Sequence, residues 1–309
     1  MRFDAATRIG TPLLHPPRAA IEARNRRLGS VYSTLPMSTV SAAGTPGSFL
    51  DRHYFLLRRL HSLSGVVPIG VFLIPHLTTN SSIVWGEQLG HSPYGPGTGG
   101  IYTFQHEVDF IHSLPALVLI EVGLIWLPLL FHAALGIVFA RTGRTNVSAY
   151  RYGGNWRYSL QRITGYVALV FIFLHLSSLR WGWTYAGFFP TFSATEAAST
   201  TAEHFQDGRL GLAMAAIYLL GVLSAVYHFA NGLWSAAITW GLTVSRQAQV
   251  RWGRVCTAIG LFLGAMGIAA IWGFSTLNIG KAQEIEAQMQ AGVQVSEGIP
   301  SGVPVESGN

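Results

Sequence analysis

Five long apolar segments constrain this chain more than any other feature of its sequence. After Arg58 and Arg59 the chain has no Asp, Glu, Lys or Arg until Glu87, and such a run is long enough to cross the hydrocarbon core of a bilayer. Only 11% of the residues are charged, against about 25% in soluble domains. The sequence therefore predicts an all-α integral membrane protein with five transmembrane helices. We expect these helices at residues 60–80, 113–140, 161–179, 210–240 and 253–277.

The arginines lie in particular loops, and their positions predict how the helices are oriented. The segment between the second and third spans carries several arginines, whereas residues 81–112 contain no Lys or Arg. Because positive loops stay in the cytoplasm, we expect a cytoplasmic N-terminus and an outer C-terminus in a bacterial cytoplasmic membrane. The net charge of +6 then reflects topology and gives no reason to expect nucleic acid as a partner.

The polar ends of the chain are expected to lie outside the membrane domain. Residues 1–50 are rich in Arg, Pro and Ser and are typical of a disordered cytoplasmic tail, within which Met37 is an alternative start of translation. We expect the transmembrane domain at residues 51–280 and a flexible outer tail at residues 281–309. The single cysteine, Cys256, can neither form an internal disulfide nor hold an iron–sulfur cluster, so any such cluster belongs to a partner.

Each of the first four spans contains one deep histidine: His76, His132, His175 and His228. An ionisable side chain inside a membrane is costly and indicates a functional site unless a neighbouring helix satisfies it. The predicted orientation places His76 and His175 toward the outer leaflet and the other two toward the cytoplasm, with the levels about 10 Å apart by helical rise. Two facing histidines at each of two levels are what two bis-histidine haem b groups require in a four-helix bundle.

Short patterns around these histidines repeat along the chain. The motifs HAALG and HFANG begin at the histidines of spans two and four, and each places a glycine one turn further on the same helix face. In spans one and three, Gly65 and Gly165 precede the deep histidine by eleven and ten residues. These repeats predict an internal pseudo-twofold relation. Four unrelated histidines that only pack between helices would not account for the repeats or for the pairing by depth.

Several sequence blocks closely resemble one family of membrane proteins. They are YFLLRRLHSLSGVVPIGVFLIPHL, HSLP, WLPLLFHAALG, NWRYSLQRITGY and YHFANGLWSAAITWGLTV, and they lie within residues 54–244. In these blocks the chain is similar to the cytochrome b membrane-anchor subunits of succinate:quinone oxidoreductases, in the class with five helices and two haems. Neither tail is covered, and the fifth span matches only in being apolar.

The resemblance implies cofactors, partners and a function. His132 and His228 would hold the iron of the inner haem, and His76 and His175 the iron of the outer haem. The partners would be a flavoprotein with covalently bound FAD and an iron–sulfur protein, both on the cytoplasmic side. Electrons from succinate would then pass through the two haems b to menaquinone or another quinone, while the dicarboxylate chemistry stays in a partner subunit.

The resemblance also indicates secondary sites. Contacts to haem propionates are expected from four residues at the inner ends of spans one and three: His61, Ser62, Trp156 and Arg162. Quinone reduction takes up protons, and Glu107 and Glu121 near the outer end of span two are the candidate acids. Some fumarate reductases of this class have a glutamate two residues before the last haem histidine, where this chain has Val226.

Two other functions stay open at the level of the sequence. A fumarate reductase anchor would have the same histidines and run the reaction in reverse, because direction depends on haem potentials, the quinone and the flavoprotein. A haem-free membrane anchor, in which the histidines relay protons, would have the same spans. A reduced-minus-oxidised spectrum separates this last function from the others, because only haem proteins absorb as b-type cytochromes.

Overall fold

The computed structural model describes residues 49–142, 153–208 and 210–292. These residues form helices joined by loops and turns, with no strand among them. The chain divides into two compact units, residues 1–52 and 53–309. In the first unit only the short helix α2 (Phe49–Arg52) is described, so most of the predicted N-terminal tail lies outside the described residues.

Five helical segments of the second unit are long and apolar enough to span a membrane, as the sequence predicts. They are Tyr54–Leu89, Leu117–Thr142, Asn155–Leu179, Gly211–Thr239 and Arg246–Thr276. The fifth span begins at Arg246, before the predicted start at residue 253. A spanning helix can include arginines near its end, because their long side chains extend to the membrane surface. Large apolar side chains such as Leu119, Leu212 and Leu261 are exposed on the spans, as expected where lipid covers them.

The first two spans are built from several helical pieces. The first consists of α3 (Tyr54–Ser64), η1 (Gly65–Gly70), α4 (Val71–Trp85) and η2 (Gly86–Leu89). The second consists of α6 (Leu117–Ile120), η3 (Glu121–Trp126) and α7 (Leu127–Thr142). The remaining spans are α8 (Gly153–Leu179), α10 (Gly211–Thr239) and α11 (Arg246–Thr276). Both η1 and η3 are single π-helical turns, a form that often occurs at functional sites.

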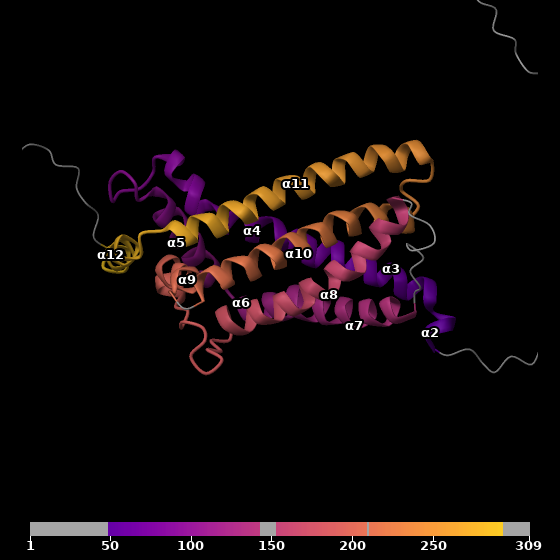
Figure 1. Ribbon diagram of the computed structural model, residues 1–309, viewed down its shortest axis with the longest axis horizontal. Coiled ribbons are helices and arrows are strands. Elements are labelled where there is room, and N and C mark those ends of the chain that lie inside the picture. Colours follow the sequence, from indigo (N-terminus) through magenta and orange to yellow (C-terminus); the bar gives the residue numbers. More distant parts are fainter. Residues whose placement is uncertain (1–48, 143–152, 209, 293–309) are drawn as a thin grey trace, which may run out of the picture. The chain divides into compact units, whose positions relative to one another are not determined.

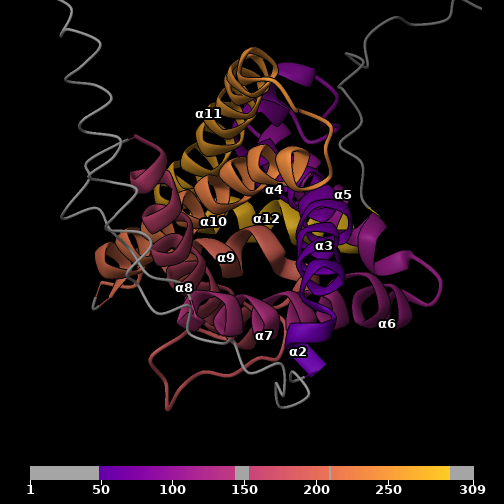
Figure 2. The same cartoon turned by 90° about the vertical axis from the view of Figure 1, so that its right-hand side faces the viewer.

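Helix α10 has the most central place among the spans. It packs against α8 and α11, and it also contacts α3 and η1 of the first span. Helix α11 packs in turn against α4, while α7 packs against α3 and η1 (Figures 1 and 2). Spans one to four therefore form the histidine-containing bundle, and α11 lies against two of its helices.

Helices outside the spans form a cap at one end of the bundle. The cap consists of α5 (Gly99–Ser113), η4 (Ala194–Glu196), α9 (Ala197–Gln206) and α12 (Ile279–Gln290), which contact one another (Figure 1). Its core is apolar, with the rings of Phe104 and Phe274 5.0 Å apart. The Gln105 side chain joins α5 to η4 and α9, because it donates to the Ala194 carbonyl at 2.9 Å and accepts from the Ala197 amide at 2.8 Å.

The structure differs from the sequence prediction at residues 281–290, which belong to α12 where we expected a flexible tail. Asn278 begins this helix, since its side chain accepts a hydrogen bond from the Lys281 amide at 3.0 Å. Glu286 is fully buried and accepts a hydrogen bond from the Ala198 amide of α9 at 2.7 Å. The polar composition concealed this helix, because only a narrow apolar face is needed to pack it on the cap. The rest of the predicted tail lies outside the described residues.

Charged side chains are separated along the bundle. Within residues 53–292, every described Asp and Glu lies in the cap, in its loops or at the adjoining ends of spans one and two; we name this the acidic end. The opposite, arginine-rich end carries the following residues: Arg58, Arg59, Arg141, Arg157, Arg162, Arg246, Arg251 and Arg254. This separation is the charge pattern from which the sequence predicts a cytoplasmic arginine-rich end.

Candidate functional site

Two pairs of histidines converge inside the bundle. The inner pair, nearer the arginine-rich end, is His132 on α7 and His228 on α10, with ring centres 5.9 Å apart. The outer pair, nearer the acidic end, is His76 on α4 and His175 on α8, with ring centres 5.6 Å apart. The structure therefore brings the four deep histidines together in the predicted pairs. Among the described residues no group of three or more His, Cys, Asp or Glu side chains is placed to hold a metal ion.

The rings of the inner pair are held by the backbone of neighbouring helices. Nδ1 of His132 donates to the carbonyl oxygen of His61 at 2.9 Å, and Nδ1 of His228 donates to the carbonyl oxygen of Gln161 at 2.9 Å. A carbonyl oxygen can only accept, so both rings carry a proton on Nδ1. The Nε2 lone pair of each ring is left for another partner, which is the usual state of a metal-binding imidazole.

The outer pair lies among aromatic side chains. Phe72 stacks on His76 with ring centres 5.1 Å apart, and Phe171 stacks on His175 with ring centres 5.7 Å apart. The hydroxyl of Tyr218, a buried residue of α10, lies 3.4 Å from Nδ1 of His175. His175 is therefore oriented by a side chain, whereas both inner histidines are oriented by backbone oxygens.

Glycines make room for the inner rings in the same way in both halves of the chain. A Cβ atom at Gly65 would lie only 2.4 Å from Cε1 of His132, and a Cβ atom at Gly165 would lie 2.9 Å from Cε1 of His228. Both distances are shorter than real carbon contacts, so a side chain at either position would push the imidazole away. The SG and TG motifs are therefore explained by close passage of the histidine rings over the backbone.

The twofold relation extends one turn further along the helices. Gly136 of the HAALG motif lies against the ring of His61, and Gly232 of the HFANG motif lies against the side chain of Gln161. His61 and Gln161 occupy equivalent positions, because each also supplies the carbonyl oxygen that holds an inner histidine. The predicted internal repeat is thus present in the structure, with spans one and two equivalent to spans three and four.

The π-helical turn η1 explains the one-residue difference between the halves. Eleven residues separate Gly65 from His76, but ten separate Gly165 from His175. One extra residue in an α-helix would rotate everything after it by about 100°. A π turn holds one more residue than an α turn, so η1 absorbs the difference and His76 still faces its partner.

The residues expected to contact propionates lie partly at the inner pair. Three of them have a buried polar atom without a hydrogen bond in the described part of the chain: His61 Nδ1, Ser62 Oγ and Arg162 Nη1. The ring of His61 stacks on that of His132 with centres 4.0 Å apart, so His61 lies deeper than an interfacial position. Arg162 reaches the same region, because it donates to the carbonyl of Phe139, whose ring packs on His61. Trp156 is half exposed.

The two carboxylates expected to serve quinone protonation have different surroundings. Both oxygens of Glu121 accept hydrogen bonds from Arg180, at 2.9 and 2.8 Å, in a bidentate ion pair that links spans two and three. The hydrogen bonds that Arg180 donates to this carboxylate raise the pKa of Arg180. Glu107 on α5 has a buried oxygen, Oε2, that makes no hydrogen bond to any described residue.

Arg180 and Tyr218 were not predicted as residues of the site, and the contact of Gln161 with His228 was not predicted either. Superposing the two halves on their SG and TG motifs would have found Gln161, because it aligns with His61. Its side chain also donates to the His228 carbonyl at 3.0 Å. Arg180 has a weaker signal, as an isolated cation at the outer end of span three. Tyr218 has no signal in the sequence beyond a hydroxyl group within an apolar span.

Comparison with known proteins places the chain in a family. Over 220 residues it is 35% identical to the succinate dehydrogenase cytochrome b558 subunit of Bacillus subtilis (strain 168), a match that covers 71% of this chain and 96% of that protein. No family model matches the chain. Because the similarity extends over nearly the whole relative and the structure has five membrane-spanning helices, this chain belongs to the family of succinate dehydrogenase cytochrome b subunits.

Proposed function

We propose that this chain is the dihaem membrane anchor of a succinate dehydrogenase and carries electrons between the cytoplasmic subunits of the complex and a quinone in the membrane. The observation that carries the proposal is the convergence of two histidine pairs at two levels of one bundle. The name of the Bacillus subtilis relative supports the class of complex, the presence of haem b and the direction of succinate oxidation.

The residues around each pair fit a haem b group. His132 with His228, and His76 with His175, would each hold the iron of one haem b group, because each pair brings together two imidazoles from separate helices. Ring-centre separations of 5.6 and 5.9 Å would leave both imidazoles of a pair within reach of a single metal ion. The unpartnered donors of His61, Ser62 and Arg162 fit the anionic propionates of an inner haem. The exposure of Trp156 fits that role less well.

The residues of the chain would hold and insulate these groups. When bound, the haems supply one-electron redox chemistry. The carbonyl oxygens of His61 and Gln161 fix the tautomer of the inner histidines, and the Tyr218 hydroxyl orients His175. The apolar bundle excludes water, and this low-dielectric surrounding tunes the potential of a bound redox centre.

A quinone site at the acidic end needs a group that delivers protons, because reduction to the quinol takes them up. Of the two candidates we favour Glu107, since its Oε2 has no partner among the described residues while both oxygens of Glu121 are held by Arg180. Glu107→Gln is expected to slow the reduction of menaquinone, or of whichever quinone is used, and to leave b-type absorbance unchanged. If the Glu107→Gln variant reduces the quinone as fast as the unchanged chain, another residue delivers the protons.

The arginine-rich end would face the cytoplasm and the partner subunits. Positive charge near span ends marks the cytoplasmic side, and this end carries no described acidic side chain within residues 53–292. A flavoprotein with FAD and an iron–sulfur protein would dock there, closest to the inner pair. The anchor itself would then do no chemistry on the dicarboxylate.

The absorbance spectrum of the purified full-length chain tests the proposal. We expect a reduced-minus-oxidised spectrum of b-type cytochrome with two haems per chain. His132→Ala and His76→Ala are each expected to remove one haem. The haem that remains should have a different midpoint potential in each variant. His106→Ala, at an exposed histidine of α5, is the control and should keep both. A chain without b-type absorbance, or variants that keep both haems, would refute the assignment.

A further inference from the structure

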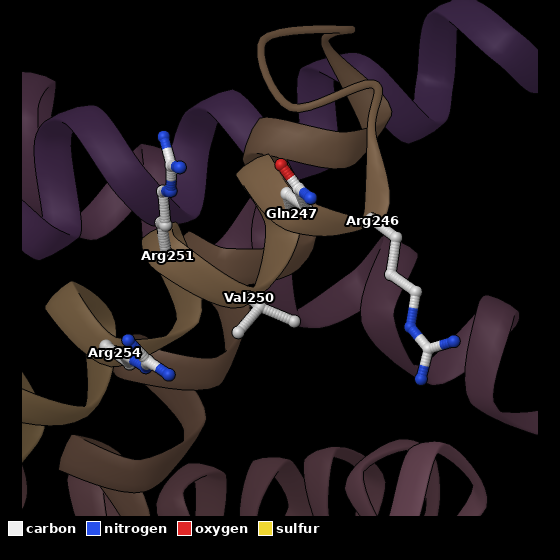
Figure 3. Close-up of a pocket in the computed structure, with 5 residues that line it drawn as sticks. All are labelled: Arg246, Gln247, Val250, Arg251 and Arg254. Carbon is white, nitrogen blue, oxygen red and sulfur yellow. The ribbon is translucent and has the colours of Figure 1, made fainter.

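Three arginines at the start of α11 surround a shallow cavity of about 240 Å³. Five exposed residues line it: Arg246, Gln247, Val250, Arg251 and Arg254. They lie on one face of the helix, with Val250 between the arginines, and the guanidinium groups point to different sides of it (Figure 3). The three cations therefore border an area on the surface and do not meet at one point.

These arginines differ from others at the same end of the bundle. Four arginines of spans one and three each lie over an aromatic ring of the chain: Arg58, Arg59, Arg157 and Arg162. By contrast, Arg246, Arg251 and Arg254 make no hydrogen bond, ion pair or ring contact to any described residue. No described acidic side chain of residues 53–292 lies at this end to neutralise them. Unpaired cations at a membrane boundary attract anionic groups from the lipid surface.

The exposed face of α11 continues from these arginines as an apolar stripe. Leu261 and Ile268 follow Arg254 at intervals of seven residues, which keeps them on the same side of the helix. Their side chains are 72% and 48% exposed. From Arg254 to Ile268 the helix rises about 21 Å, more than the half-thickness of a hydrocarbon core of about 30 Å. One helix face thus presents cations at the boundary and an apolar surface beneath them.

We infer that this face of α11 binds an anionic phospholipid, with its phosphate headgroup at Arg246, Arg251 and Arg254 and an acyl chain along Leu261 and Ile268. The spread of the guanidinium groups suits a headgroup lying on the surface better than a small free anion. The apolar stripe would have no role in binding free phosphate. A water-soluble partner could not cover the stripe either, because Leu261 and Ile268 lie within the membrane-spanning helix. The inference does not depend on haem binding, and it assigns a role to the one span that lacks a deep histidine.

Spin-labelled lipids test the inference with the full-length chain in detergent-free bilayers. The probes are phosphatidylglycerol and phosphatidylcholine, and the fraction of immobilised label gives the relative association of each. We expect the chain to prefer phosphatidylglycerol over phosphatidylcholine. Because each arginine near an anionic lipid surface contributes about 1 kcal/mol, removing one arginine should lower this preference by about fivefold. The variant R246Q/R251Q/R254Q should lose the preference, and the matching triple Lys variant should keep much of it. Arg141→Gln removes an exposed arginine of the same end on α7 and should have no effect.

Further measurements separate the other occupants from the lipid. Inorganic phosphate should not displace the labelled lipid, and displacement by phosphate alone would mean a free-anion site. Co-purification of the partner subunits should be unchanged in the triple Gln variant, and loss of assembly with an unchanged lipid preference would mean a protein-docking surface. An unchanged preference in the triple Gln variant, with circular dichroism showing that it is folded, would also overturn the inference.

Discussion

Nδ1 of His132 lies 2.9 Å from the backbone carbonyl oxygen of His61, and this hydrogen bond determines which nitrogen of the imidazole can bind a metal ion. Gln161 supplies the same contact to His228 in the other half of the chain. In both halves a glycine follows the carbonyl one turn later, where the ring passes over the backbone. The inner pair is thus built from one structural unit used twice.

Replacing Gly65 by alanine is expected to disturb the inner pair alone. The new Cβ would lie 2.4 Å from Cε1 of His132, so the ring must move away from the His61 carbonyl. Overpacking of this kind costs roughly 1–3 kcal/mol, and we expect haem content to fall toward one per chain. Gly123→Ala is the control, because a Cβ there meets no atom within 4 Å and Gly123 also lies in a π turn. Full haem content in Gly65→Ala would contradict this account.

Deleting one residue should be tolerated in span one but not in span three. Removing Val67 from η1 lets the π turn become an α turn, so that His76 keeps its direction. Removing Val167, at the equivalent place in the continuous helix α8, rotates His175 by about 100°. We expect the first variant to keep both haems and the second to lose the outer one, as measured by reduced-minus-oxidised spectra. Equal loss in both would mean that η1 does not absorb the extra residue.

Tyr218→Phe is expected to change the outer haem without removing it. The Tyr218 hydroxyl lies within hydrogen-bonding distance of Nδ1 of His175, at 3.4 Å. A hydrogen bond to the nitrogen that does not bind the metal tunes the properties of a metal site. The midpoint potential and electron paramagnetic resonance signal of one haem should shift, while those of the other stay fixed. Tyr227→Phe, on the same helix, serves as the control. Identical potentials in the Tyr218 variant and the parent would assign the orientation of His175 to other contacts.

The stability of the cap is expected to depend on pH through Glu286. Burial raises the pKa of this carboxyl group. The folded state then binds more protons than the unfolded state, so stability is lost as pH rises from the unfolded value of about 4.3 through the folded pKa. Hydrogen exchange of the α9 amides, corrected for intrinsic rates, should show this loss of protection. Glu286→Gln should abolish the dependence, and Glu284→Gln, at an exposed position of α12, should retain it.

Much of the fold could be predicted because lipid imposes simple rules on a sequence. Long uncharged runs defined the five spans. One deep histidine per span, together with the orientation predicted from the arginine-rich loops, was enough to predict which rings meet. Contacts that depend on tertiary packing were harder to predict. Arg180, at the end of span three, forms an ion pair with Glu121 of span two, and the sequence around either residue gives no sign of this pair.

The docking of α12 on α9 sets an order for biogenesis. Glu286 covers the first amides of α9, yet it is synthesised after the fifth span. Four spans and their histidines can therefore come together while the ribosome is still adding the remainder of the chain. The cap at the acidic end is complete only when α11 has been inserted and α12 has followed it to that end. A nascent chain would thus pass through a stage in which the cap lacks α12 and the first amides of α9 have not yet met Glu286.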